Sequence, residues 1–343
     1  MRVGVEVGGT FTDLVAIDES GVITVAKVPS VPAAPDEGAF NALLASGVAI
    51  SEIEDLTHGS TIATNAVLER KGAKVAFVTT QGFRDILIMQ RHSRSRVYDL
   101  TYQKPEPVVK RRDSFEVNER LLADGSVLEA LDAQAVEREL IPRLKEGDYE
   151  AVAICLLNGY ANPAHEEELA GIITRHCQGM QVAISSGVTR EFREYERAST
   201  TTLSAYVQPV INRYLEKFED QLTGSGFTGR FSVMQSNGGR LPAEGMRRNA
   251  ITALLSGPAA GVMGAVRQAA RSGFDNLVTF DMGGTSTDVC LVTQGKPDLT
   301  SEFQLDGLPI RTPIIDINTV GAGGGSIIWI DDGGMLRAGP QSA

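Results

Sequence analysis

The sequence predicts an α/β protein. Short apolar stretches that fit strands recur along the chain, and amphipathic segments of helical length stand between them. A strand, a Gly-Gly turn and a second strand occur together twice, once near each end of the chain. The 343 residues, 42% of them hydrophobic, suffice for two or three domains at roughly 100–200 residues each.

The N-terminal part is predicted to open with a meander of three strands. Gly8-Gly9 and Ser20-Gly21 supply the turn residues between them. Two helices follow, and Gly72 closes the second because glycine accepts the positive φ common after a helix. The predicted strands cover residues 2–7, 12–17, 22–28 and 74–79, and the predicted helices cover residues 36–45 and 60–71.

The middle of the chain is less regular. Periodicity weakens over residues 84–125, where Pro105 and Pro107 occur, so we expect extended loops there that contribute to a substrate or partner surface. A helix is predicted from Asp132, and Asn162-Pro163 is typical of the start of another. Strands are predicted over residues 149–157 and 182–185.

The C-terminal part begins with a long amphipathic helix over residues 200–222. Pro209 interrupts it and can kink the helix or begin a new one. Residues 257–271 are rich in glycine and alanine, which lets a helix approach its neighbour closely. Strands are predicted over residues 230–235 and 276–281.

Composition excludes several classes of protein. No apolar run reaches the ~18–20 residues of a membrane span, and the N-terminus lacks the pattern of a signal peptide, so we expect no membrane insertion and a cytoplasmic location. The three cysteines show no paired spacing, which disfavours disulfides and zinc. A net charge of −11 opposes nucleic-acid binding, and the basic clusters at 91–96 and 110–112 are interpreted as solvated loops.

The two glycine hairpins carry the functional prediction. EVGGTFTDLVAI (residues 6–17) and DMGGTSTDVCLV (residues 281–292) share an acid, a spacer, Gly-Gly-Thr, two further residues and Asp. Backbone N–H groups of such a turn can converge on a phosphate. Hydroxyl groups add donors at Thr10, Thr12, Thr285 and Ser286, and carboxylates surround the site at Glu6, Asp13, Asp281 and Asp288. These acids would repel a polyphosphate unless a cation such as Mg²⁺ lies between them.

A single Gly-Gly hairpin is usually an ordinary β-turn, but two copies favour a clamp on one nucleotide phosphate chain. Other nucleotide motifs are missing from the sequence: Gly295-Lys296 is followed by Pro297, which excludes a P-loop, and Ser326 breaks a dinucleotide fingerprint. Neither a serine-hydrolase elbow nor a zincin histidine pair is present in the sequence. The sequence therefore predicts a bound nucleotide phosphate chain with a divalent cation such as Mg²⁺ beside it.

The paired hairpins resemble those of the actin, sugar-kinase and heat-shock-chaperone ATPases. The chain is more specifically similar to the hydantoinase A / 5-oxoprolinase family, which includes ATP-binding subunits of ketone carboxylases and lactamases. This resemblance lies in residues 57–87, 197–209, 234–239, 255–262, 280–289 and 320–327. It implies two ribonuclease-H-like lobes, with an N-terminal domain over residues 1–199 and an incomplete second domain over residues 200–343.

The resemblance also implies roles for individual residues. Asp281 and Glu6 would orient Mg²⁺ or water, with Asp281, Asp13 and Asp288 as the catalytic acids. The phosphates would be held by Gly8, Gly9, Thr10, Phe11, Thr12, Gly283, Gly284, Thr285 and Ser286, and Gly323, Gly324 and Gly325 would lie near the nucleotide. Two roles stay open for His58, Thr61, Asn65, Arg84 and Asp85: contacts to substrate or phosphoryl groups, or helix capping and loop packing.

The family's activity implies an ATP-binding subunit that phosphorylates the carbonyl oxygen of a lactam or hydantoin for hydrolysis, together with a hydantoinase B-like second subunit. A ketone carboxylase subunit and a non-catalytic nucleotide switch are the alternatives, and a sugar or acid kinase fits less well. Two features depart from the family: Glu6 stands where the wider superfamily has aspartate, and the chain ends at GPQSA, where relatives continue, so a truncated second lobe is expected.

Overall fold

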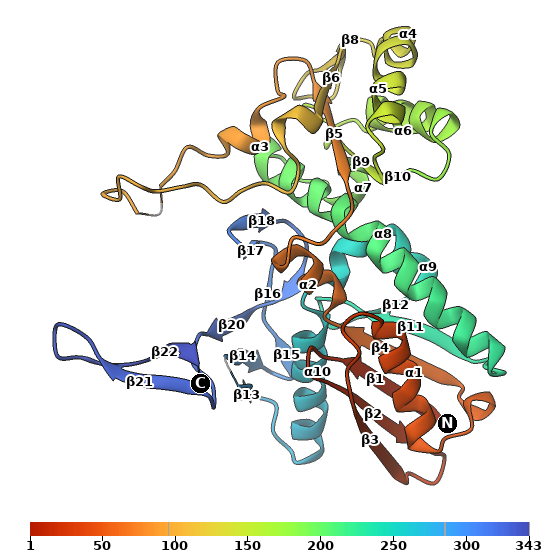
Figure 1. Ribbon diagram of the computed structural model, residues 1–343, viewed down its shortest axis with the longest axis vertical. Helices are drawn as coiled ribbons and strands as arrows, with labels where there is room; N and C mark the ends of the chain where they lie inside the picture. The colour runs from red at the N-terminus through yellow and green to blue at the C-terminus, as the bar shows by residue number, and fades with distance from the viewer. Residues whose placement is uncertain (95, 285, 343) are drawn as a thin grey trace.

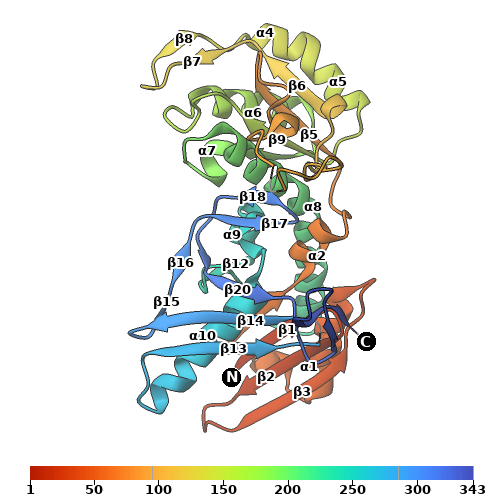
Figure 2. The ribbon, with the colours of Figure 1, turned by 90° about the vertical axis from the view of Figure 1, so that its left-hand side faces the viewer.

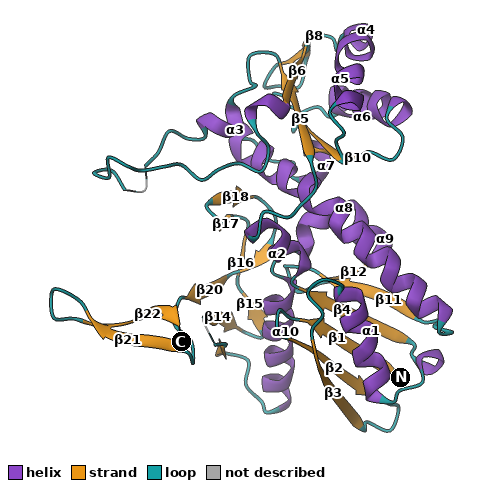
Figure 3. Cartoon of the chain, in the orientation of Figure 1, coloured by secondary structure: helices purple, strands orange, loops and turns teal. Residues whose placement is uncertain are grey.

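Figure 1 shows the computed structural model of the chain, which describes residues 1–94, 96–284 and 286–342. Helices and strands alternate along most of its length (Figure 3), and the predicted α/β class is confirmed. Three sheets of six, four and four strands carry the fold, and the long helix α8 (Glu194–Gly224) packs against the first two.

The first sheet is a mixed sheet of six strands. β1, β2 and β3 form the predicted meander and pair antiparallel, whereas β4 lies parallel to β1 and β11 parallel to β4. Its buried face packs against α1 (Pro35–Ser46) and the C-terminal part of α8. The strands, in sheet order, are β12 (Arg240–Pro242), β11 (Arg230–Met234), β4 (Asp55–Ser60), β1 (Arg2–Val7), β2 (Phe11–Ile17) and β3 (Ile23–Pro29).

The second sheet has four parallel strands and forms the upper lobe in Figure 1. Its central strand β9 is buried at every position, as expected for a parallel strand covered on both faces. α5 and α6 cover one face, and the N-terminal half of α8 covers the other. The elements are β10 (Gln181–Ile184), β9 (Ala151–Cys155), β5 (Val75–Thr80), β6 (Ser114–Val117), α5 (Ile141–Glu146) and α6 (Ala164–His176).

The third sheet contains the second glycine hairpin. β13 and β14 pair antiparallel, and β14 also pairs with β15 and β20. Helix α10 (Ser256–Arg271) packs on this sheet through Val262 and Val266 and also contacts β4 and β11 of the first sheet. α10 therefore lies between the two hairpin-bearing sheets, as Figures 1 and 2 show. The strands are β13 (Leu277–Met282), β14 (Thr287–Thr293), β15 (Lys296–Pro297) and β20 (Ile317–Val320).

Short elements complete the chain. The β21–β22 hairpin projects away from the rest of the molecule on the same side as the loop that follows α3 (Figure 1). The remaining helices are α2 (Ile62–Leu68), α3 (Ile86–Met89), α4 (Ala133–Ala135), α7 (Ser185–Val188), α9 (Ala243–Arg248), the π-helical η3 (Val136–Leu140) and the 3₁₀ turns η1 (Ile50–Glu52), η2 (Arg111–Asp113) and η4 (Ala250–Ala253). The remaining strands are β7 (Arg120–Leu121), β8 (Val127–Glu129), β16 (Leu299–Thr300), β17 (Phe303–Leu305), β18 (Leu308–Ile310), β19 (Ile314–Ile315), β21 (Ser326–Ile330) and β22 (Leu336–Ser342).

Two local predictions were wrong, and one of the two roles predicted for Pro209, the start of a new helix, is excluded. α2 ends at Leu68, so Gly72 does not close it; glycine is needed there because a Cβ would overlap the ring of Tyr206 on α8. Residues 84–125 are not only loops, since β6 forms an edge of the second sheet. Pro209 lies inside α8, which continues as one helix from Glu194.

The predicted domain boundary at residues 199 and 200 falls inside α8. Strands β11 and β12, from beyond that boundary, pair in the first sheet. The division into two domains therefore stays a prediction.

Among the described residues, no helix is both long and apolar enough to cross a membrane. The three cysteines, Cys155, Cys177 and Cys290, are buried free thiols.

Candidate nucleotide site

Hairpin 1 (residues 6–13) joins β1 to β2 through a tight turn. Glu6 lies directly opposite Asp13, and Val7 lies opposite Thr12. The Gly8 N–H donates to the Phe11 carbonyl at 3.1 Å and closes the turn. A Cβ built on Gly9 would meet no atom within 4 Å, so the tip of the turn opens into free space.

Hairpin 2 (residues 281–288) repeats this geometry between β13 and β14. Asp281 lies opposite Asp288, and Met282 lies opposite Thr287, in the same register as hairpin 1. The Gly283 N–H donates to the Ser286 carbonyl at 2.9 Å, and Gly284 is as open as Gly9. Thr285, predicted to bind phosphate, lies outside the described residues.

A threonine hydroxyl holds each hairpin to a neighbouring segment. Thr12 Oγ1 lies 3.0 Å from Ser30 Oγ, which donates to the Gly8 carbonyl at 2.7 Å. At the matching position, Thr287 Oγ1 donates to the Ala322 carbonyl at 2.6 Å. Both threonines are buried, so the Thr12 hydroxyl supports the turn from inside and does not face the open tip. Thr287 was not among the predicted site residues, although the Thr-Asp pair is repeated in both motifs.

The glycine loop (residues 321–326) lies directly on hairpin 2. The N–H groups of Gly324 and Gly325 donate to the carbonyls of Gly283 and Gly284 at 2.9 and 2.7 Å. A Cβ on Gly323 would lie 2.6 Å from the Gly283 carbonyl oxygen, so only glycine allows this approach. The structure thus brings Gly323, Gly324 and Gly325 together with hairpin 2.

The four carboxylates have different surroundings. Lys27 Nζ contacts Asp13 at 2.7 Å, and Thr319 Oγ1 donates to Asp288 at 2.6 Å. Asp281 is exposed, and among the described residues no hydrogen bond or ion pair engages its side chain. Glu6 is mostly enclosed, and burial, together with the negative charge of Asp13, raises its pKa to about 7. Asp281 is therefore the acid most available to a ligand.

The Glu6 carboxyl group fits between two glycines from different elements. A Cβ on Gly59 of β4 would overlap Glu6 Oε2, and a Cβ on Gly257 of α10 would lie 2.6 Å from Oε1. The start of α10 is fixed nearby, because Leu255 N–H donates to Thr64 Oγ1 at 3.0 Å and Ser256 Oγ donates to the Ser60 carbonyl at 3.2 Å. The sequence analysis noted Gly257 only as a small packing residue.

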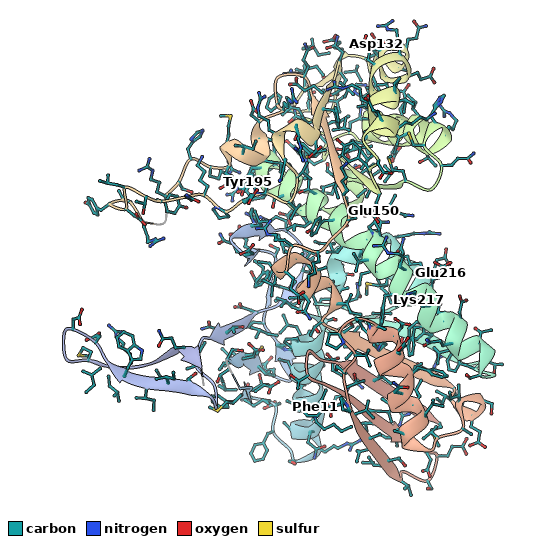
Figure 4. All side chains as sticks on the ribbon, in the orientation of Figure 1. Phe11, Asp132, Glu150, Tyr195, Glu216 and Lys217 are labelled. Carbon is teal, nitrogen blue, oxygen red and sulfur yellow. The ribbon has the colours of Figure 1, made fainter. Side chains whose placement is uncertain are left out.

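Among the described residues, no hydrogen bond or ion pair joins the two hairpins directly; α10 connects their sheets. Figure 4 shows Phe11, the last turn residue of hairpin 1, at the side of its sheet that faces α10. Phe11 is 46% exposed, with Lys27 Nζ 4.9 Å from its ring centre. Both hairpins thus belong to sheets packed on one helix.

The residues present fit a bound phosphate chain. The tips at Gly9 and Gly284 are open, and no described residue accepts a hydrogen bond from the N–H group of either glycine. Among the described residues, no group of three or more His, Cys, Asp or Glu side chains is arranged to hold a metal ion. Mg²⁺ commonly uses only one or two carboxylates together with water and substrate phosphates, so one exposed acid such as Asp281 is a sufficient protein ligand.

Thr61 and Asn65 lie beside hairpin 1. Thr61 Oγ1 donates to the Val7 carbonyl at 3.3 Å, and Asn65 Nδ2 donates to Thr61 Oγ1 at 3.2 Å. Both side chains therefore tie the start of α2 to the strand that enters the turn. Within the described part of the chain, Thr61 makes no side-chain capping hydrogen bond to α2, so these contacts pack the helix start against hairpin 1, and a substrate contact stays a prediction.

His58 lies in the core. Its Nδ1 is 3.1 Å from the Val5 carbonyl, its Nε2 is 2.6 Å from the Tyr214 hydroxyl, and none of its surface is exposed. Burial lowers its pKa to about 4, so the ring is neutral near pH 7. The ring therefore packs in the core, and both of its nitrogens have protein partners.

Arg84 and Asp85 lie in the upper lobe at the start of α3. Arg111 donates two hydrogen bonds to Asp85, at 2.6 and 3.1 Å, and lowers the pKa of that carboxyl group. Arg84 donates to the Arg111 carbonyl at 3.2 Å. The two residues therefore form a local ionic cluster on the second sheet, and the structure does not bring them to the hairpins.

Comparison with known proteins gives one consistent family. Residues 2–177 match the model of the hydantoinase/oxoprolinase N-terminal region, and residues 197–343 match the hydantoinase/oxoprolinase model. Caprolactamase subunit alpha of Pseudomonas jessenii is 34% identical over 100% of this chain and 50% of its own length. Acetophenone carboxylase gamma subunit of Aromatoleum aromaticum is 32% identical over 99% of this chain and 49% of its own length.

Solved structures agree with these matches. The crystal structure of the ATP-dependent caprolactamase from Pseudomonas jessenii superimposes with a TM-score of 0.88 at 33% sequence identity, covering 100% of this chain and 51% of that one. The chain thus spans about half the length of these curated relatives.

Proposed function

This chain belongs to the hydantoinase/oxoprolinase family, and from that premise we propose that it is the ATP-binding part of an enzyme that activates the carbonyl group of a cyclic amide. The substrate class is a lactam or hydantoin, and the reaction is ATP-dependent hydrolysis. A second subunit of the hydantoinase B type completes the enzyme, which acts in the cytoplasm.

One observation supports this proposal most strongly. The two hairpins, far apart in the sequence, share their strand register, their closing N–H to carbonyl bond and their open second glycine. A β-turn needed only to reverse the chain would not have to repeat all three features. Two matched anion-binding turns on sheets packed against one helix suit a ligand with several phosphates.

The acids divide into two roles. Asp281 is exposed beside the turn, so we assign it to orient Mg²⁺ between the phosphate oxygens. Asp13 and Asp288 support the two turns, since each is already held by a neighbouring side chain. Glu6 is a poor metal ligand, because its carboxyl group is enclosed between Gly59 and Gly257 and its pKa is raised to about 7.

The proposed reaction is phosphoryl transfer. The bond between the β- and γ-phosphates breaks, the γ-phosphorus bonds to the amide carbonyl oxygen, and ADP leaves. Water then adds to the activated carbon, and the ring C–N bond opens as the nitrogen takes up a proton, which leaves an acyl phosphate. A second water hydrolyses the acyl phosphate to the carboxylate and free phosphate. The protein contributes positioning and charge neutralisation. The open turn N–H groups at Gly9 and Gly284 would donate to phosphate oxygens, and Asp281 would hold the ion that offsets their charge.

Replacing Asp281→Asn tests this assignment. The amide keeps the size of the side chain and removes the charge, so we expect Mg²⁺-dependent ATP hydrolysis to fall by about 100-fold while the far-UV circular dichroism stays unchanged. ATP hydrolysis is measured with the partner subunit and a panel of lactams and hydantoins present. Asp332→Asn is the matched control, because it removes the same charge from the exposed turn between β21 and β22.

Unchanged hydrolysis in Asp281→Asn, or equal losses in both variants, would refute the role of Asp281.

The similarity to acetophenone carboxylase gamma subunit gives a second candidate function, that of a ketone carboxylase. Bicarbonate separates the two: a cyclic amide hydrolase releases phosphate with its carbonyl substrate alone, whereas a carboxylase requires bicarbonate and a ketone.

A further inference from the structure

Glu6 is enclosed by backbone from three elements. Its own strand is β1, Gly59 lies beside it on β4 in the parallel register, and Gly257 approaches from the first turn of α10. The two glycines leave a gap that the carboxyl group fills. A Cβ at either glycine would overlap a Glu6 carboxyl oxygen in its present position. The carboxyl group fits in the gap only because both neighbours lack a side chain.

This contact is the point where α10 meets the strand that enters hairpin 1. Leu255, just before the helix, adopts a left-handed backbone conformation with φ of 56°, which is unfavourable for a non-glycine residue. The hydrogen bonds to Thr64 and Ser60 hold it there. The same helix packs on β14, so its position also determines where hairpin 2 lies.

We propose that Gly59 and Gly257 are positioning residues for the nucleotide site. They admit the Glu6 carboxyl group as a spacer between β1 and α10, and this spacer sets the separation of the two hairpins. The link to ATP rests on the proposed function; the spacer itself rests on the steric fit alone.

The inference also accounts for glutamate at this position. Aspartate is shorter by one C–C bond, about 1.5 Å, so its carboxyl group would withdraw from the gap between the two glycines. A glutamate whose carboxyl group stays in this gap therefore requires glycine at both neighbouring positions, whereas an aspartate leaves room for alanine. Residues 6, 59 and 257 should then respond to substitution as one set.

Hydrogen–deuterium exchange of the α10 peptide (residues 256–271) tests the spacer in the full chain without nucleotide. In Gly59→Ala the added methyl group pushes the carboxyl group against α10, and in Gly257→Ala the methyl group on α10 itself meets the carboxyl group. In both variants we expect exchange at the start of the helix to rise at least tenfold. In Glu6→Asp/Gly59→Ala the shorter acid removes the overlap, so exchange should return to within threefold of Glu6→Asp alone.

Gly261→Ala is the matched control on the same helix, because a Cβ there meets no atom within 4 Å. Its α10 exchange should not rise. Far-UV circular dichroism identifies a variant that fails to fold, and in that case recovery of folding by Glu6→Asp supports the inference. Unchanged exchange in both alanine variants, or no rescue by Glu6→Asp, would overturn it.

ATP titration by calorimetry provides the second readout. We expect Gly59→Ala to weaken ATP binding about tenfold and Glu6→Asp/Gly59→Ala to recover it. Equal ATP affinity in the wild type and Gly59→Ala would overturn the positioning role. If the exchange pattern is as expected but the wild type binds no ATP with Mg²⁺ and the partner subunit present, the proposed function fails and the steric spacer stands.

Discussion

His58 is buried on one face of the first sheet, and Glu6 is partly buried on the opposite face. His58 lies opposite Val5, and Glu6 lies opposite Gly59, so the alternation of strands sends one side chain into the core and the other toward α10. Burial raises the pKa of Glu6 to about 7 and lowers the pKa of His58 to about 4. In the folded protein His58 is therefore neutral above about pH 4, and Glu6 is mainly neutral below about pH 7.

The two shifts act on stability in opposite directions. An unfolded glutamate ionises near pH 4.5 and the folded one near 7, so the stability that Glu6 provides below pH 4.5 is lost as the pH rises to 7. An unfolded histidine takes up a proton below pH 6.5 and the folded one only near 4, so the stability that His58 provides is lost as the pH falls from 6.5 to 4.

Glu6→Gln should therefore change the pH profile of stability. Relative to the wild type, we expect the variant to gain about 2 kcal/mol in the free energy of unfolding between pH 4.5 and 7, allowing for solvent near the carboxyl group. Urea denaturation at a series of pH values measures this difference. The exposed Glu19→Gln is the control, and a wild-type profile parallel to that of Glu6→Gln would contradict the prediction.

At the scale of elements, the hairpins were the most predictable feature. A Gly-Gly pair followed by an apolar segment predicts a turn followed by a strand. A turn at this position places Glu6 opposite Asp13 and Asp281 opposite Asp288, which are the pairs found in the structure. The roles of Gly59 and Gly257 could not be predicted in this way, because they depend on a parallel neighbour and a helix from a distant part of the chain.

Other elements differed from prediction for the same reason. Pro209 is tolerated inside α8, whose burial along most of its length outweighs the local preference of proline. Gly72 marks the approach of Tyr206 and not the end of a helix. Local residue preferences predict where helices and strands occur. Contacts between distant elements determine where each element ends and which neighbouring side chain packs against a glycine.

Gly323→Ala should detach the glycine loop from hairpin 2. The new Cβ would meet the Gly283 carbonyl oxygen at 2.6 Å and the Ser286 nitrogen at 2.7 Å, and backbone atoms cannot move aside as a flexible side chain would. We expect the free energy of unfolding to fall by about 2 kcal/mol, measured by urea denaturation. Gly321→Ala is the control, since its Cβ meets no atom within 4 Å; equal losses would contradict the steric explanation.

At the scale of the whole molecule, apolar surface concentrates on the third sheet and the β21–β22 hairpin. An apolar groove beside hairpin 2 is lined by residues of both, including Phe280, Met282 and Ile328. Ile330 on β21 is 69% exposed, and Leu336 on β22 is 73% exposed. Exposed apolar side chains grouped on strands favour association with other protein surfaces.

We therefore expect the isolated chain to self-associate as its concentration rises. Sedimentation velocity across a dilution series should show a larger weight-average mass at high concentration, and Ile330→Lys should reduce it. Leu44→Lys, at a position on α1 that is 60% exposed, places the same charge on a different surface and should not. A wild-type chain that stays monomeric at every concentration would contradict this expectation.

The β21–β22 hairpin also carries the single tryptophan of the chain, Trp329. Its indole N–H donates to the Gly339 carbonyl at 3.0 Å across the hairpin, and the ring is 44% exposed. Intrinsic fluorescence excited at the indole band consequently originates from this one place. A blue-shifted emission maximum on mixing with another protein would signal burial of the hairpin without any added label.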